Sequence, residues 1–194
     1  MTARSATKCY ISWNRNWTWL RCIRASGSDG REGDGPSMPI LIREAVPSDA
    51  RHIAELVDAL LQEIMAVIGT HAFHASVADT ETCVRSWLTD GTYTILLACE
   101  GDAPCGFLTL AECRALYVGG VFGIIPELYV RPDRRSQGVG RELVAEATRV
   151  ARSKHWARLD VTTPPLPQFD RTLTFYERQG FSVSGGRKMK VDIR

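Results

Sequence analysis

The chain has 194 residues, of which 44% are hydrophobic and 24% charged, and its formal net charge at pH 7 is +2. This length and composition are typical of one globular domain, and the small net charge argues against a dedicated nucleic-acid-binding protein. The six cysteines include no closely spaced zinc-binding pair, and no stretch reaches the roughly 18 apolar residues of a membrane span. We therefore expect reduced thiols, a cytoplasmic location, and no metal, nucleic-acid or membrane partner.

The first 37 residues differ in composition from the rest of the chain. Residues 1–28 contain five basic residues and no acidic residue, and a Gly/Ser/Asp/Glu run, SGSDGREGDGPS, extends to residue 37. The basic part is similar in composition to a mitochondrial transit peptide. A poorly ordered extension or a misassigned start would explain this composition as well. The second is favoured because Met38 is followed directly by the strand-like PILIREA. We predict that residues 1–37 are such an extension or misassigned start, and that residues 38–194 form a single domain.

The predicted elements begin with a strand at residues 40–45, which ends before Pro47. Ser48 or Asp49 then offers a helix N-cap, and apolar residues recur up to residue 64 at the spacing of a helix buried on one face. A shorter helix is predicted at residues 81–88, after a loop or irregular helix.

Three strand-like runs follow, at residues 92–100, 105–116 and 123–130, and the pair Gly119–Gly120 indicates a hairpin turn between the last two. Because proline cannot donate a hydrogen bond to a sheet, Pro126 predicts an interruption or bulge in the third run. The remaining predicted elements are a helix with apolar residues at 143, 144, 147, 150 and 151, a strand at 157–163, a helix at 170–179 ended by Gly180, and a terminal hairpin. This order predicts an α/β fold with a mixed central sheet and helices on both faces.

The segment RRSQGVGREL, residues 134–143, has the composition of a phosphate-binding turn. A nucleoside-triphosphate loop would need lysine after Gly140, where this chain has Arg141. A nicotinamide-dinucleotide turn would need a third glycine at Leu143, although Asp160 lies at about the expected distance. Besides the dinucleotide turn, two interpretations remain: a plain strand-to-helix turn and, third, an R-x-x-G-x-G turn that binds a pyrophosphate. In the R-x-x-G-x-G turn, the glycines let the backbone approach the anion, N–H groups and the helix dipole bind it, and the arginines add positive charge.

The surroundings of this turn resemble a known family. PELYVRPDRRSQGVGRELV and FYERQGF resemble two motifs of the GNAT superfamily of acetyl-CoA-dependent N-acyltransferases, and the order of elements over nearly all of residues 38–194 is similar as well. The resemblance implies acetyl-CoA as the donor, with its pyrophosphate on the turn, and a small-molecule or protein amine as the acceptor; it leaves a homodimer open. The donor-binding residues that it implies are Leu128, Tyr129, Val130, Arg135, Ser136, Gln137, Gly138, Val139, Gly140 and Arg141.

Two positions depart from the family's pattern. Ser136 stands where glycine is commoner in the family, and because serine is small and keeps its N–H, we expect little effect. Phe169 stands where many relatives carry an asparagine that touches the cofactor, so this contact is not expected here.

Acetyl transfer to an amine requires that the ammonium lose a proton and the thioester carbonyl be polarised, and the leaving thiolate benefits from a proton. The resemblance points to Glu127 as the base, acting through a water, to the N–H groups of residues 128–130 for the carbonyl, and to Tyr176 as the proton donor. A surface carboxylate and a packed core tyrosine are the structural alternatives for these two side chains. His71 and His74 form H-x-x-H without a third ligand at a readable spacing, so we expect no metal there, only solvated loop residues or part of the acceptor cleft. A non-catalytic acyl-CoA-binding module and a nicotinamide enzyme are the alternative functions.

Overall fold

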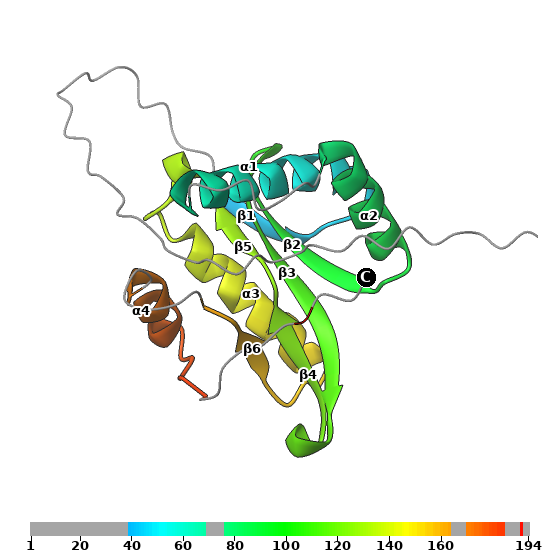
Figure 1. The fold of residues 1–194 in the computed structure, drawn as a ribbon, viewed down its shortest axis with the longest axis vertical. Helices are drawn as coiled ribbons and strands as arrows, with labels where there is room; N and C mark the ends of the chain where they lie inside the picture. Colours follow the sequence, from blue (N-terminus) through cyan, green and yellow to red (C-terminus); the bar gives the residue numbers. More distant parts are fainter. Residues whose placement is uncertain (1–38, 69–75, 164–169, 185–190, 192–194) are drawn as a thin grey trace, which may run out of the picture.

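The computed structural model describes residues 39–68, 76–163, 170–184 and 191. The predicted extension at 1–37, the two histidines of H-x-x-H, Phe169 and most of the predicted terminal hairpin lie outside these residues. The strands are β1 (Ile40–Glu44), β2 (Tyr93–Glu100), β3 (Ala103–Ala115), β4 (Gly120–Ile125), β5 (Leu128–Val130) and β6 (Leu159–Val161). The helices are α1 (Ala50–Ile68), α2 (Val77–Thr89), α3 (Val139–Ser153) and α4 (Asp170–Arg178) (Figure 1).

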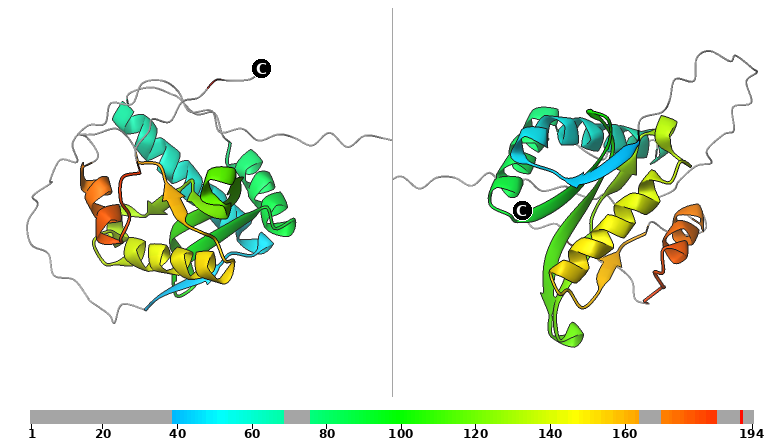
Figure 2. Two further views of the ribbon diagram at one scale, coloured as in Figure 1. Left: turned by 90° about the horizontal axis from the view of Figure 1, so that it is seen from below. Right: turned by 180° about the vertical axis from the view of Figure 1, so that it is seen from behind.

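The six strands form one sheet in the order β1-β2-β3-β4-β6, with β5 also paired to β3. Because side chains alternate along a strand, Ile95 and Leu97 of β2 pack with α1 and α2, whereas Leu96 packs with α3 on the other face. Figure 2 shows α1 and α2 on one side of the sheet and α3 on the other. The predicted α/β fold with helices on both faces is therefore confirmed.

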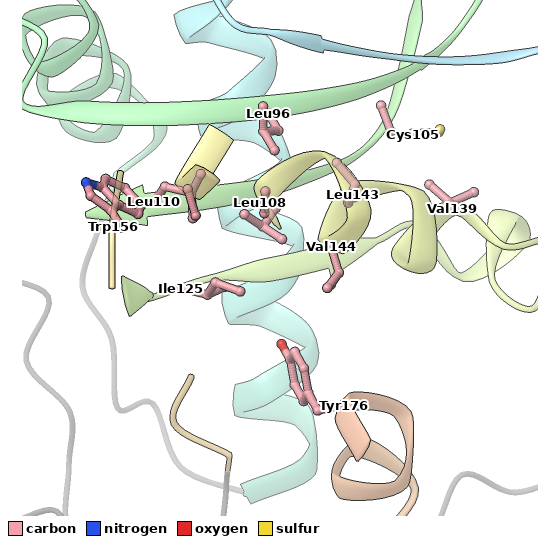
Figure 3. Close-up of a cluster of buried hydrophobic side chains, with 13 residues drawn as sticks. Leu96, Cys105, Leu108, Leu110, Ile125, Val139, Leu143, Val144, Trp156 and Tyr176 are labelled. Atoms are coloured by element: carbon pink, nitrogen blue, oxygen red, sulfur yellow. The ribbon is translucent and has the colours of Figure 1, made fainter. Parts of the chain in front are cut away.

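The buried hydrophobic cluster between the sheet and α3 extends to α4. Leu108, Leu143 and Val144 are almost completely buried there, and Tyr176 of α4 belongs to the same cluster (Figure 3). Helix α4 is therefore attached to the sheet by an aromatic side chain that also lies close to the candidate site described below.

The predicted interruption at Pro126 is confirmed as a bulge. Strand β3 pairs antiparallel with both β4 and β5, and the matched pairs are Ala111 with Ile124 and Leu108 with Leu128. Two residues of β3 therefore face three residues of the opposite chain, which is the extra residue that defines a bulge. Beyond this point the parallel pair β4–β6 ends, at Ile125 opposite Val161, and β5 pairs with β3. The bulge thus separates β5 from β6 and opens the sheet between them.

Several elements differ from the prediction in their ends, among them α2, β4 and β6. Helix α2 begins at Val77 rather than at residue 81, because the side chain of Ser76 caps it by accepting a hydrogen bond from the N–H of Asp79. Strand β6 has three residues instead of the seven predicted. Residues 181–184, the first part of the predicted terminal hairpin, contain no strand.

Candidate functional site

A cleft of about 1040 Å³ opens where the bulge separates β5 from β6. Its walls are the second half of α1, the edge formed by residues 125–130, the turn at 134–141 with the start of α3, and α4. This volume is at the upper end of the range for small-molecule sites, roughly 300–1,000 Å³, so the cleft has room for a large ligand. Nine of the ten predicted donor-binding residues line it, and Gln137 does not.

The two glycines of the turn at 134–141 differ, because the backbone of Gly138 favours glycine whereas a Cβ at Gly140 would make an ordinary van der Waals contact. Gly138 has a φ of 90°, a left-handed conformation that favours glycine, and is the N-cap of α3. Gly140 lies against α4, where a Cβ would come 3.4 Å from Cζ of Phe175. Ser136 also has a positive φ, of 64°. The expectation that serine is harmless at this position was therefore incomplete, because the backbone conformation there is one that glycine adopts with less strain.

The three arginines of the turn have different partners. Both Nε and Nη2 of Arg134 donate to Oε2 of Glu100, at 2.8 and 2.6 Å, which ties the turn to β2. Arg135 binds both carboxylate oxygens of Glu63 on α1, at 2.9 and 2.7 Å, and donates from Nε to the carbonyl of Val130 at 2.9 Å. Arg141 is largely exposed beside Glu142. The guanidinium best placed to meet an anion at the N-terminus of α3 is therefore that of Arg141, whereas Arg134 and Arg135 hold the turn in place.

The other two residues of the turn contribute through their backbone. The side chain of Gln137 donates to the carbonyl of Asp133 at 3.0 Å, and the side chain of Val139 is buried in the core. Their N–H groups lie in the first turn of α3 or just before it, where helix N–H groups lack intrahelical acceptors and form a site for anions. The structure thus provides an N–H-rich helix start at one end of the cleft.

Strand β5 presents part of its backbone to the cleft. The N–H of Thr109 donates to the carbonyl of Glu127 at 3.0 Å, and the N–H of Arg131 donates to the carbonyl of Cys105 at 2.8 Å. Because backbone groups alternate between the two edges of a strand, the N–H groups of Leu128 and Val130 are turned away from β3, toward the separation from β6. The N–H of Tyr129 faces β3 instead, so the prediction for residues 128–130 is wrong for this middle N–H.

Glu127 lies in the bulge and lines the cleft. Its backbone N–H donates to the hydroxyl oxygen of Thr109 at 3.0 Å, and the same hydroxyl donates to its carboxylate. Sequence reasoning missed Thr109, because it lies on another strand 18 residues away and belongs to no motif. An alternating strand pattern could have shown only that Thr109 faces the same side of β3 as Phe107.

Tyr176 of α4 lines the cleft from the opposite wall. Its ring makes edge contacts with Phe175 and Phe181, with centroids 5.1 and 5.4 Å away, and its oxygen points from α4 toward Ile125 (Figure 3). Burial raises the pKa of Tyr176 to about 12, so its hydroxyl keeps its proton at neutral pH. The structure therefore brings Glu127, Tyr176 and the turn, which are up to 49 residues apart in the chain, to one cleft.

Further observations concern other kinds of site. Among the residues that the structure describes, no group of three His, Cys, Asp or Glu side chains could hold a metal ion. No described helix is long and apolar enough to cross a membrane. A nicotinamide-dinucleotide site is built on a parallel sheet, whereas β4–β6 is the single parallel pair among the described strands. In addition, both carboxylate oxygens of Asp160 are bound by Arg158.

Comparisons with known proteins agree with this geometry. The family described as "Acetyltransferase (GNAT) domain" matches residues 91–183. The peptidyl-lysine N-acetyltransferase YjaB of Escherichia coli (strain K12) is 30% identical over 122 residues, which cover 62% of this chain and 71% of that protein. Among solved structures, the aminoglycoside acetyltransferase meta-AAC0020 from an uncultured soil sample has a TM-score of 0.65 at 16% identity, covering 80% of this chain and 97% of its own. The ribosomal-protein-alanine N-acetyltransferase of Brucella melitensis biovar Abortus 2308 has a TM-score of 0.61 at 19% identity, covering 79% and 100%.

Proposed function

Because this chain belongs to the GNAT family of acetyltransferases, we propose that it transfers the acetyl group of acetyl-CoA directly to a primary amine in a ternary complex. The observation that carries the proposal is the cleft at the bulge. One end of the cleft is an N-terminal helix turn rich in N–H groups, and its middle is a strand edge with outward N–H groups at Leu128 and Val130. Direct transfer needs both substrates in one cleft, and about 1040 Å³ leaves room for both reacting groups.

Acetyl-CoA fits the chemistry of the residues present. The first turn of α3, with Gly138 at its N-cap and Arg141 exposed beside it, offers N–H groups, a helix dipole and one guanidinium to the pyrophosphate. The N–H groups of Leu128 and Val130 suit the carbonyl oxygens of the pantetheine arm and the thioester. Acetyl-CoA supplies an activated acetyl group, and the residues of the chain position it.

The two side chains on opposite walls fit two needs of the reaction, a base for the amine and a hydrogen-bond donor for the leaving sulfur. Glu127, which lines the cleft just before β5, takes a proton from the acceptor ammonium through a water. Tyr176 donates a hydrogen bond to the sulfur as the thioester breaks, and its buried hydroxyl remains protonated for this purpose. The bond from carbon to nitrogen forms and the bond from carbon to sulfur breaks. Of the two protons that the ammonium loses, the first leaves through Glu127 before the attack, and the second passes to the CoA thiolate, which leaves as the thiol.

We propose that the acceptor amine is carried on an apolar stem, as in a lysine side chain. The α1 wall of the cleft contains Val57, Leu60, Leu61 and Ile64, and its carboxylate, Glu63, is paired with Arg135. The described lining of the whole cleft has five arginines and three carboxylates. A polycation such as an aminoglycoside would need an excess of acidic side chains, so the charge balance favours an amine with few other positive charges.

An acceptor panel with detection of released CoA thiol tests the proposed function. The panel compares lysine-containing peptides, free lysine, a simple alkylamine and sisomicin, each at a fixed acetyl-CoA concentration. We expect CoA release with lysine peptides or the alkylamine at a kcat/KM at least tenfold above that with sisomicin. An acetyl-CoA-dependent rise in thermal stability without CoA release from any amine would favour the non-catalytic module instead. A rise in stability with NAD and none with acetyl-CoA would contradict both.

We also propose a cytoplasmic location. Among the described residues, Cys99, Cys105 and Cys113 are free thiols, and burial raises the pKa of Cys99 and of Cys105. Protonated, buried thiols persist in a reducing compartment, where acetyl-CoA is also needed by the proposed reaction. Fractionation of cells that express the native gene checks this location.

A further inference from the structure

Thr109 lies at the centre of the bulge that carries Glu127. It is buried, at 4% exposure, in the middle of β3 and stands opposite the extra residue of the β4–β5 segment. Buried threonine hydroxyls need hydrogen-bond partners, and this one is bonded to Glu127 and also interacts with Tyr93.

Four hydrogen-bond contacts join the two residues, and the longest is that of the Thr109 hydroxyl with the Glu127 carbonyl, at 3.5 Å. The other three are shorter. The Thr109 N–H donates to the Glu127 carbonyl at 3.0 Å, the Glu127 N–H donates to the Thr109 hydroxyl oxygen at 3.0 Å, and that hydroxyl donates to the Glu127 carboxylate. In a regular ladder the Glu127 N–H would bind the carbonyl of Thr109 instead. The hydroxyl therefore replaces one ladder bond that the bulge removes and binds the carboxylate as well. The Thr109 side chain therefore helps to fix the position of both the backbone and the carboxylate of Glu127.

Tyr93 borders Thr109 on the same face of the sheet. Ile95 of β2 is the register partner of Thr109, so Tyr93, two residues earlier, is its diagonal neighbour. Burial raises the pKa of Tyr93 and the negative charge of Glu127 raises it further, while a hydrogen bond with Thr109 acts in the opposite direction. The phenol therefore stays protonated at neutral pH, and this side of Thr109 is shielded from water by the Tyr93 ring, which packs on Trp87 with centroids 5.1 Å apart.

We propose that Thr109 is a positioning residue that holds the carboxylate of Glu127 at the cleft in the orientation needed to take a proton from the acceptor amine. The inference rests on the proposed role of Glu127 as base. A glutamate side chain has three rotatable bonds, and a carboxylate that samples several orientations is aligned with the amine for only part of the time. Catalysis of proton transfer depends on such alignment, and small displacements can cost a factor of about 100 in rate.

The key variant is Thr109→Val, which keeps the shape and removes the hydroxyl. We expect kcat to fall about tenfold or more, while the KM for acetyl-CoA stays within about twofold, because no group of the turn or of β5 that faces the donor is changed. Thr109→Ser keeps the hydroxyl and is expected to restore kcat to within about threefold of the parent. Thr94→Val is the matched control, because Thr94 is also buried on a central strand but faces the α3 side of the sheet; its kcat is expected to be unchanged.

A double-mutant cycle with Glu127→Gln separates positioning from general support of the fold. Each variant is assayed with acetyl-CoA and the best amine of the panel, with thermal unfolding measured alongside. If Thr109 acts through the carboxylate, Thr109→Val costs less than about twofold in the Glu127→Gln background. Thr109→Ala completes the same cycle if Thr109→Val does not fold.

Two results would overturn the inference while leaving acetyl transfer intact. In the first, Thr109→Val lowers kcat by the same factor in both backgrounds, which indicates general support of the fold. In the second, Glu127→Gln alone retains the parent kcat, which removes the base that Thr109 is proposed to position. Failure of the proposed function has a different signature, since the parent chain would then release no CoA with any amine of the panel.

Discussion

The two sides of the cleft are built in different ways. The donor side, which we define as β5, the turn at 134–141 and the start of α3, comes from one continuous segment and offers mainly backbone N–H groups. The acceptor side, which we define as Glu127 with the α1 wall, depends on side chains from α1, β2, β3 and the bulge. Backbone groups depend on conformation, which a few glycines and a proline can encode locally. Side-chain positions on the acceptor side depend on contacts between distant segments, so this is where members of one fold can differ in substrate.

The largest expected effect comes from Glu127→Gln, which tests whether a side chain of the acceptor side takes the proton of the amine. Glutamine keeps the size of the side chain and cannot accept a proton at neutral pH, so we expect kcat to fall by a factor of about 100 or more. Binding of acetyl-CoA, measured by calorimetry, should stay within about twofold, because the donor side is unchanged. Glu55→Gln on the exposed face of α1 is the matched control. A kcat within threefold of the parent would contradict the proposed role of Glu127.

Tyr176→Phe is expected to lower kcat about tenfold with a smaller change in either KM. The pKa of about 12 lies well above that of an ordinary thiol, about 8.5, so Tyr176 is suited to stabilise the leaving sulfur by a hydrogen bond rather than to give up its proton completely. The loss of one such bond in a desolvated site corresponds to about one order of magnitude in rate. Steady-state kinetics with CoA-thiol detection checks the prediction, and an unchanged kcat would leave Tyr176 as a packing residue.

The same tyrosine has a measurable signature in stability. Its pKa is raised from 10.0 to about 12 by burial, so the unfolded chain loses this proton at lower pH than the folded chain. The contribution to stability is present below pH 10 and is lost as the pH rises from 10 to 12, by about 3 kcal/mol at most. Urea unfolding at pH 9 and 11 should therefore show a smaller loss in Tyr176→Phe than in the parent. Tyr93 also has a raised pKa, but the parent and the Tyr176→Phe variant both contain Tyr93, so its contribution cancels when the two are compared.

The contrast between the two sides also describes what could be read from the sequence. Hydrophobic spacing was sufficient for β2 and for most of α1, and Pro126 was sufficient for the bulge, because these signals are local. Helix α2 begins four residues earlier than predicted because Ser76 caps it, and the hydrophobic spacing of the sequence does not mark this cap. The hydrogen bonds of Thr109 to Glu127 and of Arg135 to Glu63 join residues 18 and 72 positions apart. No periodicity encodes such pairs. The local conformation of the donor side could therefore be predicted, whereas the contacts between distant side chains on the acceptor side could not.

The ion pair of Arg135 with Glu63 joins the two sides and allows a sharper test. The resemblance implied that Arg135 binds the donor, whereas its guanidinium contacts α1 and the Val130 carbonyl. Because both partners are about 40% exposed, the pair is worth at most about 1 kcal/mol. Without this pair, α1 is held less firmly against the turn. We therefore expect Glu63→Gln and Arg135→Gln to raise the KM for the acceptor by a similar factor of two to five.

The KM for acetyl-CoA distinguishes the two roles of Arg135. If the guanidinium only ties α1 to the turn, this KM stays within about twofold in both variants. If it also meets the pyrophosphate, Arg135→Gln alone raises the KM for acetyl-CoA, by tenfold or more, and Glu63→Gln does not. The second outcome would restore Arg135 to the donor side and make that side less dependent on backbone groups than we propose.

The smallest expected effect tests the backbone of the donor side by itself. Ser136 and His155 are the two described non-glycine residues with positive φ, at 64° and 55°. Replacing either by glycine removes strain of about 1–2 kcal/mol and adds freedom to the unfolded chain, so each should stabilise the fold by about 0.5 kcal/mol. His155 follows α3 at the end away from the cleft and is the matched control. If the turn binds the donor through its N–H groups, Ser136→Gly lowers the KM for acetyl-CoA by up to threefold and His155→Gly leaves it unchanged. Equal stabilisation of both variants with no change in this KM would mean that the conformation of residue 136 supports the fold and not the binding of the donor.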